Sequence, residues 1–291
     1  MFTPAENVSP FDVNMAADAG FDLVVPYRGV TVDSVAALVQ DAIFSRPPKR
    51  FNDTAVFIGG HDVICAADML SKAKAALVPP FEIGLFADPN GAYTTSAALL
   101  ALVAHHLQQR SQDSLEGRNV QIYGGGPVGL CTAVLVAQQG GRPLLVRLTE
   151  MTADKEKALQ EFGSRYGVDL PWVAAPSVED KAEVIASAHV VVTSAKAGVR
   201  VLPRALLDMA PALVVAADVN AVPPGGIEGI EAGDNGVELA PGSQTPVGIG
   251  ALAIGNVKYQ VQHKLLKALQ EAPEPAFLDF PDAFRLATQL V

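Results

Sequence analysis

The chain has 291 residues, of which 49% are hydrophobic and 18% are charged, so it is long enough for two domains and too apolar for a disordered protein. Its net charge of −10 argues against nucleic acid as a main partner, because that binding requires a basic surface. No apolar run reaches the ~20 residues of a membrane span, and the N-terminus lacks the pattern of a signal peptide, so we expect a cytoplasmic protein without membrane contact.

The first part of the chain alternates apolar, β-branched runs with stretches of helical periodicity, which predicts an α/β domain. We expect buried parallel strands over residues 21–25, 55–58 and 83–86. Helices are expected over residues 32–44, 62–77 and 94–109. The polar stretch SQDSLEGR that follows, residues 111–118, has the composition of a linker.

A second α/β series follows, and its repeated strand and helix units predict a Rossmann-type parallel sheet wound on both faces. Its strands are expected over residues 120–123, 144–146, 172–174, 190–193 and 213–216. Its helices are expected over residues 127–139, 153–166, 178–188 and 203–209. Residues 251–272 then read as a long helix, long enough to return to the first lobe. We therefore predict two lobes, one of residues 1–113 and 251–291, the other of residues 114–250.

A glycine-rich turn, IYGGGPVGL, joins the first strand and helix of the second series. Gly124, Gly126 and Gly129 have the G-x-G-x-x-G spacing, in which the first glycine permits a tight turn, the second lets a pyrophosphate approach and the third packs helix on strand. Pro127 and Val128 open the helix, whose N-terminal N–H groups attract an anion. The turn therefore predicts a dinucleotide site.

The second strand of this series ends in LLVRLTE, where the residue that meets the adenosine ribose is expected. Arg147 and Thr149 stand there ahead of Glu150, and an arginine pairs with a 2′-phosphate, so NADP is preferred and NAD is the alternative. Ser194 and Ala195 follow a later strand of the same sheet, and we expect them to contact the cofactor too.

Four separated phrases carry a resemblance to a known family. They are SPFDVNMAADAGFD, FADPNGAYTTSAA, AADVNAVPPGGIEGI and VGIGALAIGNVKYQ. Together they resemble the NAD(P)-dependent methylene-tetrahydromethanopterin dehydrogenases of bacterial one-carbon metabolism, over nearly the whole chain. The resemblance implies a homo-oligomer in which a hydride passes from the methylene carbon of a reduced pterin to the nicotinamide. It also implies that the N-terminal part and the C-terminal helix form the substrate lobe, with the dinucleotide lobe between them in sequence.

The resemblance also suggests which residues serve the pterin. Lys258 matches a lysine that the family places at the substrate cleft, and Asp88 lies just past a strand end; we expect both to be catalytic. The expected substrate-binding residues are Phe11, Asp12, Asn90, Thr94, Thr95, Asp218 and Asn220. The threonines are equally consistent with helix caps, and the aspartates and asparagines with turns. Which of the three aspartates bonds the amino-pyrimidine edge of the pterin stays open.

Other functions are weighed against this one. The same reaction on tetrahydrofolate is the alternative, and a bifunctional dehydrogenase and cyclohydrolase is disfavoured because the family lacks the hydrolytic half. A shikimate or amino-acid dehydrogenase requires a Lys and Asp pair for proton transfer, and no such pair stands in a loop of the first lobe. A protein that senses NADP without turnover is a further possibility. The cysteines and histidines have no metal-ligand spacing, so no metal is expected.

Overall fold

The structure is a computed structural model that describes residues 1–240 and 245–291. The chain divides into two compact units, of which unit 1 is Met1–Thr94 with Tyr259–Leu286 and unit 2 is Thr95–Lys258 with Ala287–Val291. Two of the divisions fall inside the long helices α4 (Ala92–Ser111) and α9 (Ala251–Glu271). We predict that one unit binds the pterin and the other binds the dinucleotide, and this assignment stays a prediction.

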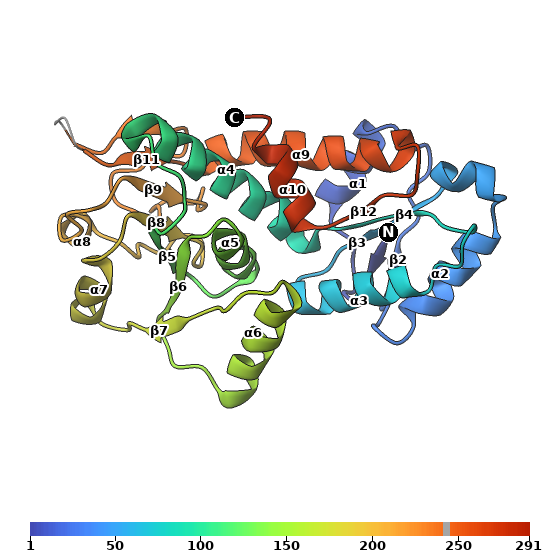
Figure 1. The fold of residues 1–291 in the computed structure, drawn as a ribbon, viewed down its shortest axis with the longest axis horizontal. Coiled ribbons are helices and arrows are strands. Elements are labelled where there is room, and N and C mark those ends of the chain that lie inside the picture. Colours follow the sequence, from blue (N-terminus) through green and yellow to red (C-terminus); the bar gives the residue numbers. More distant parts are fainter. Residues whose placement is uncertain (241–244) are drawn as a thin grey trace. The chain divides into compact units, whose positions relative to one another are not determined.

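Unit 2 is built on a seven-stranded sheet in the order β10-β11-β9-β8-β5-β6-β7 (Figure 1). The strands are β5 (Asn119–Tyr123), β6 (Arg142–Arg147), β7 (Trp172–Ala174), β8 (Val190–Thr193), β9 (Val215–Asp218), β10 (Asn235–Glu238) and β11 (Val247–Ile249). β10 pairs with β11 in antiparallel fashion, and the other neighbouring pairs are parallel. Without β10, the order is that of a Rossmann sheet, so the predicted fold class is confirmed and the antiparallel edge strand is an addition to it.

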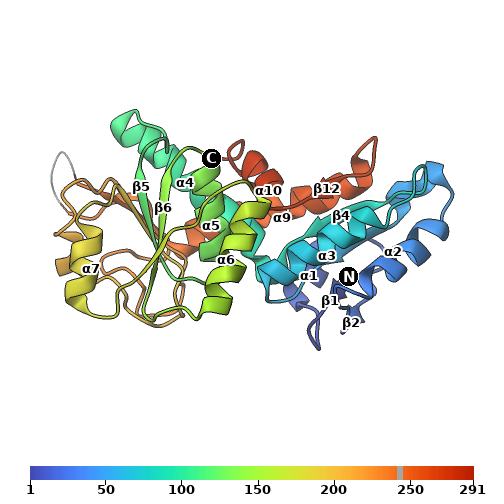
Figure 2. The ribbon, with the colours of Figure 1, turned by 60° about the horizontal axis from the view of Figure 1, so that its bottom comes forward.

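Helices cover both faces of this sheet, as expected for a doubly wound fold. They are α5 (Pro127–Gln138), α6 (Ala153–Arg165), α7 (Val178–Ile185) and α8 (Arg204–Leu207). Figure 2 shows α5 and α6 on one side of β5 and β6, with α7 on the other. The central strand β8, VVVT, is buried along its whole length, because a parallel strand covered on both faces needs a continuous apolar run. A capping box of Ser177 and Asp180 fixes the start of α7.

Unit 1 contains a second, five-stranded sheet in the order β12-β4-β3-β1-β2, and all of its pairs are parallel. The strands are β1 (Phe2–Thr3), β2 (Tyr27–Arg28), β3 (Ala55–Ile58), β4 (Gly84–Ala87) and β12 (Phe277–Leu278). The helical elements are α1 (Pro10–Asp18), α2 (Val35–Phe44), α3 (Val63–Ala75), α10 (Phe280–Ala287) and the short turns η1 (Pro48–Asp53) and η2 (Pro89–Gly91). Starting from the edge strand β2, the strands follow the order β2-β1-β3-β4-β12, which is the flavodoxin-like order. The switch point of this order lies between β1 and β3.

The strand predicted over residues 21–25 is wrong. β1 is two residues long, and on the side away from β3 it pairs with Tyr27 and Arg28, so the residues before Tyr27 are not part of a strand. Leu23 is 77% exposed and Val25 is 43% exposed, where a buried strand was expected. The apolar run therefore forms an exposed segment before a short edge strand.

The C-terminal residues 277–280, FLDF, pack in unit 1. Phe277 and Leu278 pair with β4, and Phe280 is fully buried. The end of α9 packs on the same strand, because a Cβ atom at Gly84 would lie 3.0 Å from the side chain of Leu269. No helix among the described residues combines the length and apolar composition of a membrane span.

Candidate functional site

The glycine turn of unit 2 is held by backbone contacts at its first and third glycines. Gly124 has φ +133°, and a Cβ atom there would lie 2.7 Å from the carbonyl carbon of Ser194. A Cβ atom at Gly129 would overlap the carbonyl oxygen of Gly124. At Gly126, by contrast, no atom of the described part of the chain lies within 4 Å of where a Cβ would stand. The second glycine therefore faces open space, which is where the motif brings a pyrophosphate against the backbone.

Helix α5 presents an uncapped N-terminus beside that space. Gly126 is its N-cap residue and, as a glycine, has no side chain that could cap the helix. Pro127 occupies the first turn, where its missing N–H costs nothing. The next N–H groups have no partner inside the helix, so the turn has donors and a partial positive charge for an anion.

A second loop meets the turn at the switch point of the sheet. β5 and β8 are neighbours, but the chain leaves them toward opposite edges, and α/β proteins bind ligands where this happens. Ser194 follows β8, and its hydroxyl donates to the carbonyl oxygen of Gly124 at 3.3 Å. A Cβ atom at Gly124 would also lie 2.9 Å from the amide nitrogen of Ala195. The structure thus brings the two predicted cofactor loops together.

Arg147, the last residue of β6, lies over the turn. Its Nη1 atom is 3.5 Å from the carbonyl oxygen of Gly125, and a Cβ atom at Gly125 would overlap it. Its Nε atom is buried and has no hydrogen-bond partner among the residues that the structure describes. A buried guanidinium donor without an acceptor is costly, and an anionic group of a bound nucleotide is a suitable acceptor. Thr149, two residues on, is exposed.

The phenol of Tyr123, the residue before the turn, bonds inside the fold. Burial raises the pKa of the Tyr123 phenol, which donates to the side-chain oxygen of Gln121 at 2.9 Å. The phenol therefore stays protonated at neutral pH and does not act as a base. The open space at Gly126, the uncapped helix and the orphaned Arg147 donor together fit a dinucleotide.

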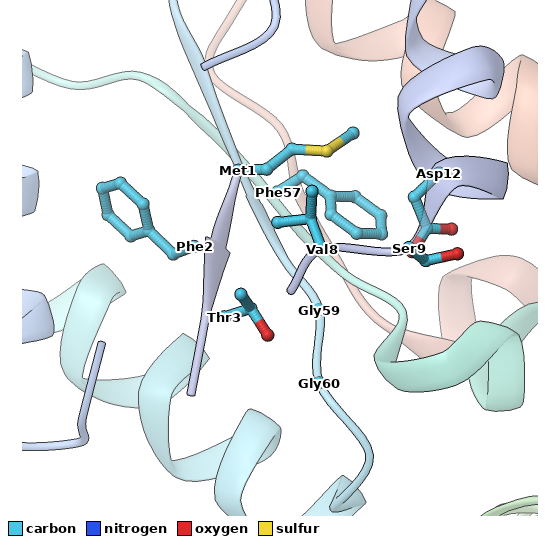
Figure 3. Close-up of a pocket in the computed structure, with 9 residues that line it drawn as sticks. All are labelled: Met1, Phe2, Thr3, Val8, Ser9, Asp12, Phe57, Gly59 and Gly60. Atoms are coloured by element: carbon cyan, nitrogen blue, oxygen red, sulfur yellow. The ribbon is translucent and has the colours of Figure 1, made fainter. Parts of the chain in front are cut away.

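Unit 1 has a small pocket of its own at the β1/β3 switch point (Figure 3). It is lined by Met1, Phe2, Thr3, Val8, Ser9, Asp12, Phe57, Gly59 and Gly60. Figure 3 shows Asp12 and Ser9 together on one side, where the chain enters α1. A wider groove in the same unit lies at the other end of the sheet, lined by Val24 and Thr54 among others. The small pocket has a volume of about 10 Å³, which is room for about one water. Because ligands of open α/β sheets bind at the carboxyl ends of the strands, we take its walls to mark the position of the candidate site and not its full extent.

Asp12 is the charged residue of this pocket. Its side chain is only 4% exposed, and Oδ1 accepts a hydrogen bond of 2.7 Å from Nε2 of Gln262 in α9. The preceding residue, Phe11, is 44% exposed and is not among the lining residues. The resemblance suggested both Phe11 and Asp12, and of these two residues only Asp12 lines the pocket.

Asp88 and Thr94 lie at the start of α4. Both are fully buried. Oδ1 of Asp88 accepts from the amide nitrogens of Tyr93 and Thr94 at 2.9 and 3.2 Å, and Oδ2 accepts from the Thr94 hydroxyl at 2.6 Å. These contacts are those of a helix cap. Asn90 is exposed in a left-handed conformation at φ 52°, and Thr95 is half-buried.

Asp218 and Asn220 hold the loop that follows β9. Oδ1 of Asp218 accepts from the Thr193 hydroxyl at 2.6 Å and from the amide of Asn220 at 3.0 Å, while Oδ2 accepts from the amide of Ile227 at 3.1 Å. Asp218 is 2% exposed. Asn220 in turn accepts from the amide of Val222 at 3.0 Å. These contacts order the loop and tie it to β8.

Lys258 lies half-buried in α9, four residues before Gln262 and hence one turn away. Gln262 was not predicted as a site residue, since no local pattern distinguishes it from other polar residues of a helix. Gly59 and Gly60 were not predicted either, although a glycine pair directly after a strand is a signal for close approach of a ligand. No group of three or more potential metal ligands occurs among the described residues.

Comparisons with known proteins add to this geometry. Residues 10–90 match the family described as methylene-tetrahydromethanopterin dehydrogenase, N-terminal. The chain is 43% identical to an NAD(P)-dependent methylenetetrahydromethanopterin dehydrogenase of Methylorubrum extorquens, over 100% of this chain and 97% of that protein. It is 33% identical to the bifunctional protein MdtA of the same organism, over 97% and 94% of the two chains.

Solved structures support the fold. Shikimate 5-dehydrogenase from Listeria monocytogenes, in complex with shikimate and NAD, superposes with a TM-score of 0.50 and 14% identity, over 98% of this chain and 95% of that one. At this identity the likeness concerns the arrangement of helices and strands alone.

Proposed function

The chain belongs to the NAD(P)-dependent methylenetetrahydromethanopterin dehydrogenase family, and from this premise we propose that it oxidises methylene-tetrahydromethanopterin with NAD(P)+. The observation that carries the proposal is the 43% identity that extends over the whole chain. In the reaction, the C–H bond of the methylene carbon breaks with both electrons, and the methenyl cation that remains is shared by two nitrogens. No proton has to be removed in this step, so the residues need to align the substrate and tolerate a positive charge.

We place the dinucleotide on unit 2. The hydride acceptor is supplied by the nicotinamide when the dinucleotide is bound. The turn from Gly124 to Gly129 would hold the pyrophosphate through backbone N–H groups, those of Val128 and Gly129 included, because Gly126 faces open space and α5 is uncapped. Ser194 and Ala195 would form the other wall of that site.

We further propose that NADP is preferred over NAD. Arg147 stands at the end of the second strand of the Rossmann sheet, where a ribose substituent is recognised, and its Nε donor is buried without a partner in residues 1–240 and 245–291. A 2′-phosphate would supply the missing acceptor and match the guanidinium in charge. Thr149 is the neighbouring candidate for a hydroxyl contact.

The reduced pterin is proposed to bind unit 1, with Asp12 as the carboxylate that accepts from its amino-pyrimidine edge. This choice rests on a comparison of three aspartates, because both oxygens of Asp88 and of Asp218 bond to their own loops, whereas Asp12 lines a pocket. Asp88 and Thr94 then become positioning residues, and Asp218 with Asn220 shapes the loop after β9. Contacts of Phe11, Asn90 and Thr95 with the pterin remain proposals that rest on the resemblance.

Lys258 is proposed to act on the pterin directly. It is the lysine that matches the family phrase, and a half-buried ammonium group sets the charge and orientation of a polar ring beside it. Homo-oligomerisation and a role in one-carbon metabolism are likewise proposed from the resemblance, and the cytoplasmic location stays a prediction.

A spectrophotometric assay tests the function. With methylene-tetrahydromethanopterin and NADP+, we expect NADPH to form, at a higher kcat/KM than with methylene-tetrahydrofolate or with NAD+. Activity on the folate carrier alone would identify the alternative substrate. Activity on shikimate, or NADP binding without turnover of either pterin, would contradict the assignment.

A further inference from the structure

The buried amide of Gln262 is directed at the carboxylate that the proposed function assigns to the pterin. Gln262 is fully buried, and its Nε2 atom lies 2.7 Å from Oδ1 of Asp12. The two residues are 250 positions apart in sequence, on α9 and α1 respectively, and both belong to unit 1. We propose that Gln262 is a positioning residue that holds Asp12 in the orientation required to bind the pterin.

The chemistry of the pair supports a role in orientation. A hydrogen bond from an amide to an ionised carboxylate is shorter and stronger than one between neutral groups, and burial of both side chains keeps water from competing for it. The bond of 2.7 Å restrains the position of Oδ1 of Asp12 and so limits rotation of the carboxylate. When the acceptor is already ordered, less conformational entropy is lost on binding, and the affinity for the ligand is higher.

A glutamine also differs from the cations that could occupy its position. Lysine or arginine would donate to Asp12 equally well, but each would neutralise its charge. The neutral amide adds no positive charge beside Asp12, so it does not weaken the attraction of the carboxylate for the N–H donors of an amino-pyrimidine. A donor without charge is therefore suited to a carboxylate that must serve a ligand.

The competing interpretation is that the bond only ties α9 to α1. Asp12 lies in the first turn of α1, where an acidic side chain is favoured by the helix dipole in any case. Loss of a purely structural tie would lower stability and leave the affinity for each ligand unchanged in the folded protein. Loss of a positioning contact would change the affinity for one ligand selectively.

The test is Gln262→Met, which keeps the side-chain length and removes the donor, with Gln270→Met as a matched control at the far end of the same helix. KM for methylene-tetrahydromethanopterin should rise about tenfold or more, with KM for NADP+ unchanged, and the control should resemble the wild type. In the Asp12→Asn background the same change should add little, because Gln262 acts through Asp12. Gln262→Glu, which has nearly the same shape, serves if the methionine variant does not fold, and should raise the same KM.

The inference rests on the proposed function, and the experiment separates the two. A wild-type protein without activity on the pterin would refute the function itself. If the wild type is active, an unchanged pterin KM in the folded Gln262 variants would overturn the inference. So would equal changes in both KM values, or an effect that is undiminished in the Asp12→Asn background.

Discussion

A pair of glycine variants separates folding from cofactor binding in the dinucleotide turn. Gly126 has φ −86° and ψ −175°, which alanine adopts freely, and no atom lies within 4 Å of the added methyl group. Gly126→Ala should therefore be as stable as the wild type or gain up to about 1 kcal/mol from the restricted unfolded chain. Gly129→Ala would instead overlap the carbonyl oxygen of Gly124 and lie 2.9 Å from the Ser194 hydroxyl, so we expect a loss of about 1–3 kcal/mol.

Gly126→Ala should weaken the binding of NADP+, although it leaves the stability of the protein intact. Its added methyl group would occupy the space through which the pyrophosphate reaches the backbone, and loss of one or two hydrogen bonds to a charged group costs about 1.5–3 kcal/mol. This corresponds to a rise of roughly 10- to 150-fold in the Kd for NADP+. Urea unfolding and calorimetric titration measure the two quantities. A Gly126→Ala protein that binds NADP+ as tightly as the wild type would refute the placement of the cofactor.

Three further variants test other parts of the account. Arg147→Ala should raise KM for NADP+ about tenfold or more with little change for NAD+, since only NADP carries the 2′-phosphate; equal effects on both cofactors would remove the reason to prefer NADP. Lys258→Ala should lower kcat about tenfold or more and leave the Kd for NADP+ unchanged. A variant with the kcat of the wild type would show that Lys258 has no role in the reaction. Asp279→Asn addresses stability: burial, followed by the charge of Asp282, raises the pKa of Asp279 from 3.8 to about 7. The folded chain thus holds a proton that the unfolded chain releases, so the contribution of Asp279 is complete below pH 3.8 and is lost as the pH rises toward about 7. The asparagine variant should therefore exceed the wild type in unfolding free energy at about pH 8, by at most about 4 kcal/mol, and the difference should shrink toward about pH 4; parallel pH profiles in urea unfolding would contradict this.

The Rossmann part of the fold follows from local signals. Strands β7 and β8 have the predicted bounds, because each is a short apolar run between clear helix and turn signals. The glycine spacing located the turn, and the structure adds that Arg147 lies over it. The bounds of β9 differ by two residues from the prediction, since an apolar run does not mark where its neighbours stop pairing.

The short elements of unit 1 could not be predicted in the same way. β1 and β12 have two residues each and exist because neighbouring strands pair with them, which no local pattern reveals. Helix α1 was missed although Ser9 and Pro10 are a helix-start signal, because few apolar residues repeat along it. The bond between Asp12 and Gln262 joins residues 250 positions apart and became visible only in the folded chain.

Transfer of a labelled hydride tests the central claim most directly. Methylene-tetrahydromethanopterin deuterated at the methylene carbon should give NADPH that carries deuterium at C4 of the nicotinamide, with none lost to water, because the account requires direct transfer between the two carbons. Reduced cofactor without the label, or deuterium released into the solvent, would contradict it.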